Sequence, residues 1–265
     1  MIMIDKKIFE KVKYYVADLD GTVYLSNNLI DGAKEFFDLA VENGKDFYFL
    51  TNNSSNNSEI ILERMIKMGF PVPEEKIIVS NQVAIEYIER NYPDKTVYLI
   101  GNERLTHDFH KANIPLTEET PDIVCIGLDD TLNYEKILKG CNYIINGAEF
   151  LVTHPDIKAP MGGYYKPDAG SIMQLFATCT GKKPLVFGKP EIYTADFLTR
   201  KLDCKREEIC MIGDCLETDI ALGVNHGMVT ACVLTGVTTP EIYEKSDIKA
   251  DVVVPSIKDL IEIFR

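Results

Sequence analysis

Two aspartates separated by one residue, Asp18 and Asp20, follow a short apolar run near the start of the chain. A run of that length predicts a buried strand that ends near Asp18. Both carboxylates would then stand at the carboxyl end of the strand, the edge where open α/β sheets bind ligands. A carboxylate at such an edge can attack phosphorus, and a neighbouring acid can protonate the leaving alcohol. The spacing therefore suits Asp18 as a nucleophile and Asp20 as a general acid and base.

Three later predicted strands also end in polar or charged residues. These ends are Thr51-Asn52-Asn53-Ser54, Gly188-Lys189-Pro190 and Gly213-Asp214. Asp214 can join Asp18 as a ligand of Mg²⁺, a hard cation that takes oxygen ligands. The cation and Lys189 would offset the repulsion between a carboxylate and a phosphoryl dianion. Thr51 and Asn52 offer a hydroxyl, an amide and backbone N–H groups to the phosphoryl oxygens.

Each of these features also has a purely structural interpretation. Gly188-Lys189-Pro190 alone is a turn with a solvated lysine, and Gly213-Asp214 alone can cap a helix. Asp219 can brace Lys189 or a metal-bound water, or it can compensate a helix dipole. Nearby acids predict an unreactive Cys215 thiol, and His154 stands where a strand ends. It is the occurrence of all four motifs in order, each at a strand end, that favours a single site.

Strand and helix signals alternate along the whole chain, which predicts a mostly parallel sheet covered by helices. The pattern restarts near residue 81, and residues 181–184 form a candidate return linker. We therefore expect a core of residues 1–80 and 183–265 with a second α/β unit, residues 81–182, inserted into it. The segment 155–167 contains three prolines and Gly162-Gly163 and is expected to be an irregular loop. Helices are expected at 219–225 and 257–264.

Composition narrows the function further. The chain has 265 residues and a formal charge of −13, with acids spread throughout, which disfavours nucleic acid as a partner. No apolar run is long enough for a membrane span, and the seven cysteines lack the spacing of a zinc site or disulfide framework. We expect a cytoplasmic protein that does not bind a membrane. No phosphate-binding loop or dinucleotide fingerprint is present, which disfavours P-loop kinases, GTPases and nicotinamide dehydrogenases.

The four motifs together resemble those of the haloacid dehalogenase-like (HAD) phosphatases. The matching residues are Asp18-Leu19-Asp20-Gly21-Thr22, Thr51-Asn52, Lys189, and Gly213-Asp214 with Thr218-Asp219-Ile220. Val186-Phe187-Gly188-Lys189-Pro190 and the segment 146–156 are similar to the NagD/4-nitrophenylphosphatase-like group. The resemblance covers nearly the whole chain. Two departures concern substrate preference more than chemistry: His154 replaces a common Asn, and Cys215 stands where Asn or Arg is frequent.

The resemblance implies a fold, a reaction and a set of roles. The fold would be a doubly wound, Rossmann-like parallel-sheet core with an inserted α/β cap. Asp18 would be the nucleophile and Asp20 the proton donor; Asp18, the Asp20 carbonyl and Asp214 would bind Mg²⁺. Thr51, Asn52 and Lys189 would hold the phosphoryl group of a small phosphorylated metabolite, such as a sugar phosphate or nucleoside monophosphate. Two alternatives stay open, a phosphotransferase or mutase and a non-catalytic phosphometabolite-binding protein. A homodimer is compatible with the family.

Overall fold

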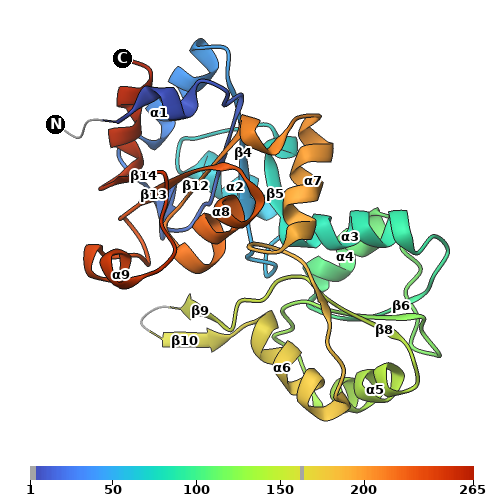
Figure 1. Cartoon of the computed structure of the whole chain (residues 1–265). Helices are drawn as coiled ribbons and strands as arrows, with labels where there is room; N and C mark the ends of the chain where they lie inside the picture. Colours follow the sequence, from blue (N-terminus) through green and yellow to red (C-terminus); the bar gives the residue numbers. More distant parts are fainter. Residues whose placement is uncertain (1–3, 162–163) are drawn as a thin grey trace. The chain divides into compact units, whose positions relative to one another are not determined.

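The computed structural model describes residues 4–161 and 164–265, which form two compact units (Figure 1). The first unit consists of 4–51, Ser58–Ile78 and Ala195–Arg265. The second consists of Asn52–Asn57 and Val79–Thr194. Both units contain parallel sheets and helices, which confirms the predicted α/β class. The expected division into a core of 1–80 and 183–265 and an insertion of 81–182 stays a prediction.

A six-stranded sheet forms the centre of the first unit, in the order β14-β13-β12-β1-β4-β5. Every neighbouring pair from β14 to β4 is parallel. The strand order reverses at β1, which lies between β12 on one side and β4 on the other. Open α/β proteins bind ligands at the carboxyl ends of the strands beside such a reversal. The strands are β1 (Tyr14–Ala17), β4 (Asp46–Thr51), β5 (Ile77–Val79), β12 (Ile209–Gly213), β13 (Val229–Val233) and β14 (Val252–Val254).

The two central strands of this sheet, β1 and β12, are continuously apolar, as expected for parallel strands covered on both faces. β12 is buried along its whole length, and in β1 only Tyr14 is partly exposed. Phe49 of β4 forms an aromatic cluster with Phe36, Phe37 and Phe70. The unit also contains a hairpin of β2 (Tyr24–Leu25) and β3 (Asn28–Leu29), and the helices α1 (Ala33–Glu42), α2 (Ser58–Lys67), α8 (Ala221–His226), α9 (Pro240–Lys245) and most of α7 (Ile192–Leu202).

Two helix predictions in this unit need correction. The segment expected as a helix over 257–264 is a 3₁₀ helix, Ile257–Ile263, capped by Ser256. The segment expected as a helix over 219–225 is divided into a π-helical turn, Leu216–Ile220, and α8. Single π turns often occur where a side chain must be turned toward a functional site.

A four-stranded parallel sheet forms the centre of the second unit, in the order β11-β8-β7-β6. Its core includes Ile100, Val124, Ile126, Val152 and Phe176. The strands are β6 (Val97–Ile100), β7 (Ile123–Ile126), β8 (Glu149–Val152) and β11 (Leu185–Val186). The helices are α3 (Ser80–Asn91), α4 (Glu103–Lys111), α5 (Tyr134–Ile145) and α6 (Ala169–Thr180).

The expectation of an irregular loop over 155–167 is wrong for the described part of that segment. β9 (Lys158–Met161) and β10 (Tyr164–Pro167) form an antiparallel ribbon, drawn in yellow in Figure 1. Gly162 and Gly163 lie outside the described residues. A two-stranded ribbon has an open edge on each strand, so it tolerates prolines that a central strand would not. Within residues 4–161 and 164–265, none of the helices combines the length and the apolar character of a membrane span.

Candidate active site

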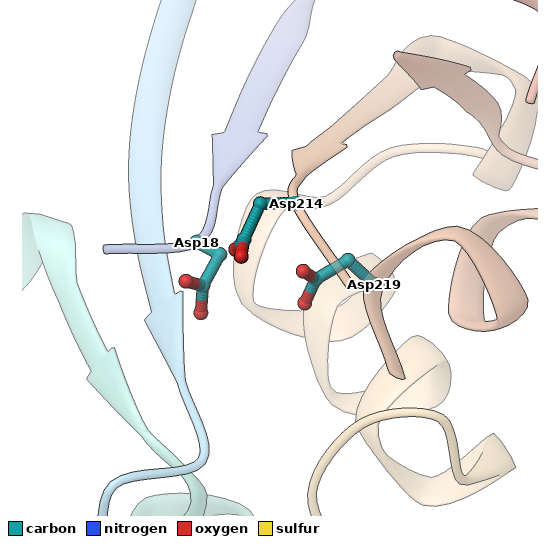
Figure 2. Close-up of side chains that lie close together, drawn as sticks. All are labelled: Asp18, Asp214 and Asp219. Carbon is teal, nitrogen blue, oxygen red and sulfur yellow. The ribbon is translucent and has the colours of Figure 1, made fainter. Parts of the chain in front are cut away.

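Three buried carboxylates meet at the edge of the first unit's sheet. Asp18 directly follows β1, Asp214 directly follows β12, and Asp219 belongs to the π-helical turn after β12. One oxygen from each lies within 4.8 Å of the others, and Figure 2 shows the three side chains close together. The backbone N–H of Asp18 donates to the Ile212 carbonyl at 2.8 Å, so β12 fixes the point at which β1 delivers this side chain.

Asp214 is held by backbone and hydroxyl donors. Its Oδ2 accepts from the Val237 N–H at 2.6 Å, and its Oδ1 accepts from the Thr22 hydroxyl at 3.4 Å. A Cβ on Gly21 would lie 2.6 Å from Asp214 Oδ2, and the φ of Gly21 is +92°, a backbone conformation that favours glycine. Gly21 and Thr22 therefore help to position the carboxylate of Asp214, a residue almost two hundred positions away.

Asp219 is the residue that sequence reasoning left undecided. It is almost completely buried, and its Oδ2 accepts from the Cys215 N–H at 3.1 Å. A Cβ on Gly213 would lie 2.2 Å from the Asp219 Cβ, so only glycine permits this approach. The spacing of Asp214 and Asp219 was visible in the sequence, but on a regular helix it does not predict convergence. The π-helical turn supplies the change in direction.

The chemistry of this cluster fits a hard divalent cation. Three buried carboxylates this close repel one another in a low-dielectric setting unless a cation or protons compensate them. Oxygen ligands from a few carboxylates are the set that Mg²⁺ takes in proteins, usually completed by water and substrate phosphate. The cluster is the sole group of this kind within the described ranges. Asp18, the Asp20 carbonyl and Asp214 were predicted as ligands; the cluster contains the carboxylates of Asp18 and Asp214 and also that of Asp219.

Asp20 lies outside the acidic cluster. Its side chain is about half exposed, at 47%, and its Oδ1 lies 3.7 Å from Arg64 Nη2. The Tyr24 hydroxyl donates to Asp20 Oδ2 at 3.4 Å, and the Arg64 guanidinium lies 4.3 Å from the centre of the Tyr24 ring. Burial, then the charge of Asp20, raise the pKa of Tyr24 well above its usual range, so the phenol stays a donor. No local pattern in the sequence predicts this arrangement.

The predicted phosphoryl-binding residues fall in both units. Thr51 is buried at the end of β4, the strand paired with β1 in the first unit. Asn52 and Lys189 are buried in the second unit, and their contact is direct. The Lys189 N–H donates to Asn52 Oδ1 at 2.8 Å, and Asn52 Nδ2 donates to the Lys189 carbonyl at 2.9 Å.

His154 is wholly buried in the second unit between two polar partners. Its Nε2 lies 3.0 Å from Asp168 Oδ1 and its Nδ1 lies 3.1 Å from the Thr153 hydroxyl. Burial would raise the pKa of Asp168, but the hydrogen bond with His154 and the Ala169 N–H hold it below its usual range. Because His154 and Asp168 flank the β9–β10 ribbon in sequence, their contact closes its base. In this respect His154 is structural.

Cys215 and Asp156 are the remaining titratable groups of interest. Burial and the charge of Asp219 raise the pKa of Cys215 to about 12, which agrees with the expectation of an unreactive thiol. Burial likewise raises the pKa of Asp156, against the opposing effects of His154, Asn52 and Lys189. Asp156 Oδ1 accepts from Asn52 Nδ2 at 3.1 Å.

Comparison with known proteins places the chain in a family. A model of haloacid dehalogenase-like hydrolases matches residues 15–115, and a second HAD-like hydrolase model matches 186–260. An acid sugar phosphatase of Staphylococcus aureus is 34% identical over 240 residues, 90% of this chain and 93% of that protein. The 5′-nucleotidase YutF of Bacillus subtilis is 34% identical over 229 residues, covering 86% and 90%.

Solved structures agree with these matches. A 4-nitrophenylphosphatase from Thermotoga maritima superposes with a TM-score of 0.94 at 35% identity, covering 97% of this chain and 99% of that one. NagD from Escherichia coli K-12 gives a TM-score of 0.87 at 28% identity, covering 94% and 98%. The chain therefore belongs to the haloacid dehalogenase-like hydrolases, and within them to the NagD-like phosphatases. It is accordingly a hydrolase of phosphoric monoesters with the predicted Rossmann-like core and cap fold.

Proposed function

We propose that this chain is a Mg²⁺-dependent phosphatase of small phosphorylated metabolites that acts through an aspartyl-phosphate on Asp18. The observation that carries the proposal is the meeting of Asp18, Asp214 and Asp219 within 4.8 Å at the carboxyl ends of β1 and β12. A nucleophilic carboxylate in this setting needs a cation, because both the phosphoryl group and the neighbouring acids repel it.

The reaction follows from the roles proposed for two aspartates. The Asp18 carboxylate attacks phosphorus, a P–O bond to Asp18 forms, and the P–O bond to the leaving alcohol breaks while Asp20 donates a proton to the departing oxygen. Asp20 then takes a proton from water, whose oxygen attacks the same phosphorus. The bond to Asp18 breaks, and inorganic phosphate leaves.

The Asp18 and Asp214 carboxylates and the Asp20 carbonyl would hold Mg²⁺, with Asp219 beside them. When bound, the cation would neutralise the developing charge on the phosphoryl oxygens. The Thr51 hydroxyl, the Asn52 backbone N–H and the Lys189 ammonium would bind those oxygens. We assign the cap to residues 81–182 and the core to 1–80 and 183–265. A cytoplasmic location and a homodimer stay predictions from the sequence.

Sugar phosphates and nucleoside monophosphates are the substrate classes we favour. The support is the naming of relatives at 34% identity as acid sugar phosphatase and 5′-nucleotidase. A phosphotransferase or mutase would form the same aspartyl-phosphate and pass the group to a second substrate. Analysis of products with added acceptor sugars separates this alternative from hydrolysis.

The first experiment measures hydrolysis of 4-nitrophenyl phosphate by wild type and Asp18→Asn, with Mg²⁺ and with EDTA. We expect turnover that EDTA removes and that the variant lacks. If folded, Mg²⁺-saturated wild type turns over neither this ester nor a panel of phosphorylated metabolites, the proposal fails. Ligand-induced thermal shifts with the same panel would then identify a non-catalytic binding protein.

A further inference from the structure

The carboxamide of Asn52 uses both of its N–H groups within the protein. One donates to the Lys189 carbonyl at 2.9 Å and the other to Asp156 Oδ1 at 3.1 Å. The Oδ1 of Asn52 accepts from the Lys189 N–H at 2.8 Å. A carboxamide has two N–H donors and no more. The Asn52 side chain therefore has no donor left for a phosphoryl oxygen, unlike the role first expected for it.

The two bonds to Lys189 hold the backbone on both sides of its Cα. The acceptor of Asn52 fixes the N–H, and one of its donors fixes the carbonyl, across 137 residues of sequence. Both residues are buried, at 5% and 2% exposure. An unpaired backbone group at such a depth is costly, so these bonds are difficult to exchange for water.

The packing around Gly188 leaves little room for another arrangement. A Cβ on Gly188 would lie 2.7 Å from Asn52 Oδ1, 2.8 Å from His154 Cβ and 3.1 Å from the Thr153 carbonyl. The loop that delivers Lys189 is therefore pressed between Asn52 on one side and the end of β8 on the other. Asp156, two residues beyond His154, completes the enclosure through its contact with Asn52.

We infer that Asn52 is a positioning residue whose side chain acts on the phosphoryl group only through Lys189, by fixing the backbone from which the lysine side chain extends. The inference rests on the proposed function, in which Lys189 binds the phosphoryl oxygens. It assigns separate tasks to neighbouring groups: the backbone N–H of Asn52 binds a phosphoryl oxygen as proposed, and the carboxamide holds the backbone of Lys189.

A double-mutant cycle tests this inference. Asn52→Ala, Lys189→Ala and the double variant are compared with wild type in kcat/KM for 4-nitrophenyl phosphate and in the inhibition constant of inorganic phosphate. We expect Asn52→Ala to weaken both about tenfold, from the loss of hydrogen bonds. Lys189→Ala should cost more, about 100-fold. The double variant should match Lys189→Ala, because a residue that acts through the lysine has no effect once the lysine is gone.

The other possible outcomes distinguish failure of the inference about Asn52 from failure of the proposed function. If the losses multiply to about 1,000-fold in the double variant, Asn52 contacts the phosphoryl group by itself and the inference is overturned. If Lys189→Ala leaves both quantities at the wild-type level, the proposed role of Lys189 fails, and the inference fails with it. If turnover by wild type does not depend on Asp18, the proposed function fails, and the inference fails with it.

A second variant covers the case in which Asn52→Ala does not fold. Asn52→Leu keeps the approximate size and adds no charge, but it has no group to accept from the Lys189 N–H or to donate to the Lys189 carbonyl and Asp156. Introduced alone it should weaken inhibition by phosphate, and combined with Lys189→Ala it should add no further loss. Asn142→Ala is the control, since Asn142 also donates to a backbone carbonyl in the second unit but is exposed. This variant should leave both quantities unchanged.

Discussion

Gly236 lies directly against the carboxylate of Asp214: a Cβ on the glycine would stand 1.9 Å from Asp214 Oδ2. Gly21 also lies against this carboxylate, and the Val237 N–H donates to its Oδ2 at 2.6 Å. These contacts leave the carboxylate essentially one position. Sites that bind a cation and a phosphoryl group depend on such placement, because small displacements of a ligand lower the rate steeply.

Gly236→Ala should therefore displace Asp214 and lower kcat/KM for 4-nitrophenyl phosphate by about 100-fold. The Mg²⁺ concentration for half-maximal rate should rise as well. The control is Val237→Ala, which trims a side chain that is 62% exposed and keeps the backbone N–H that Asp214 accepts. Equal activity of Gly236→Ala and Val237→Ala would contradict the role given to this contact.

Asp219→Asn should change stability and metal binding in opposite directions. Without Mg²⁺ the variant should melt at a higher temperature than wild type, because one of three mutually repelling buried carboxylates is gone. With Mg²⁺ it should gain less stability, and the half-saturating Mg²⁺ concentration should rise about tenfold or more. Thermal denaturation with and without Mg²⁺ measures both effects. Glu217→Gln, at an exposed position of the same turn, should show neither.

Asp20→Asn should affect substrates according to their leaving group. An alcohol such as a sugar hydroxyl needs a proton as it departs, whereas nitrophenolate leaves readily without one. We expect kcat/KM for a sugar phosphate to fall by about 100-fold to 10,000-fold, and that for 4-nitrophenyl phosphate to fall far less. kcat/KM reports the steps through phosphoryl transfer to Asp18. Asp38→Asn, at an exposed position, is the control. An equal loss of kcat/KM for both esters in Asp20→Asn would exclude proton donation by Asp20.

Asp168 and Asp156 should contribute to stability with opposite dependence on pH. The pKa of Asp168 lies below 3.8, so its contribution is complete above that value and is lost as the pH falls through the lower folded-state pKa. Asp168→Asn should therefore lower the melting temperature at pH 7 by several degrees, about 2–8 °C, and by less near pH 3.

The pKa of Asp156 is raised, chiefly by burial, so its ionised form disfavours folding above pH 3.8. Asp156→Asn should accordingly raise the melting temperature at pH 7 and change it little near pH 3. The exposed Asp130→Asn serves as control for both variants. Melting curves in which Asp168→Asn and Asp156→Asn shift in the same direction at pH 7 would contradict the assigned environments.

Local sequence patterns were sufficient to predict many of the strands and the edge of the sheet that carries the site. The apolar runs at β1, β4 and β12 predicted strands, and polar residues at their ends predicted which edge of the sheet carries the site. These features depend on neighbours within a few residues, so the order of residue types along the chain is enough to predict them.

Contacts between distant segments required the tertiary structure. Asp219 lies close to Asp18 and Asp214 because a π-helical turn changes the direction of its side chain and Gly213 leaves room for it. No periodicity in the sequence predicts either feature. The carboxamide of Asn52 serves Lys189, 137 residues away, rather than standing open to a ligand. The sequence determined which residue types stand at the strand ends. Only the fold decided which of their hydrogen-bonding groups are already used, because that depends on partners brought together by long-range packing.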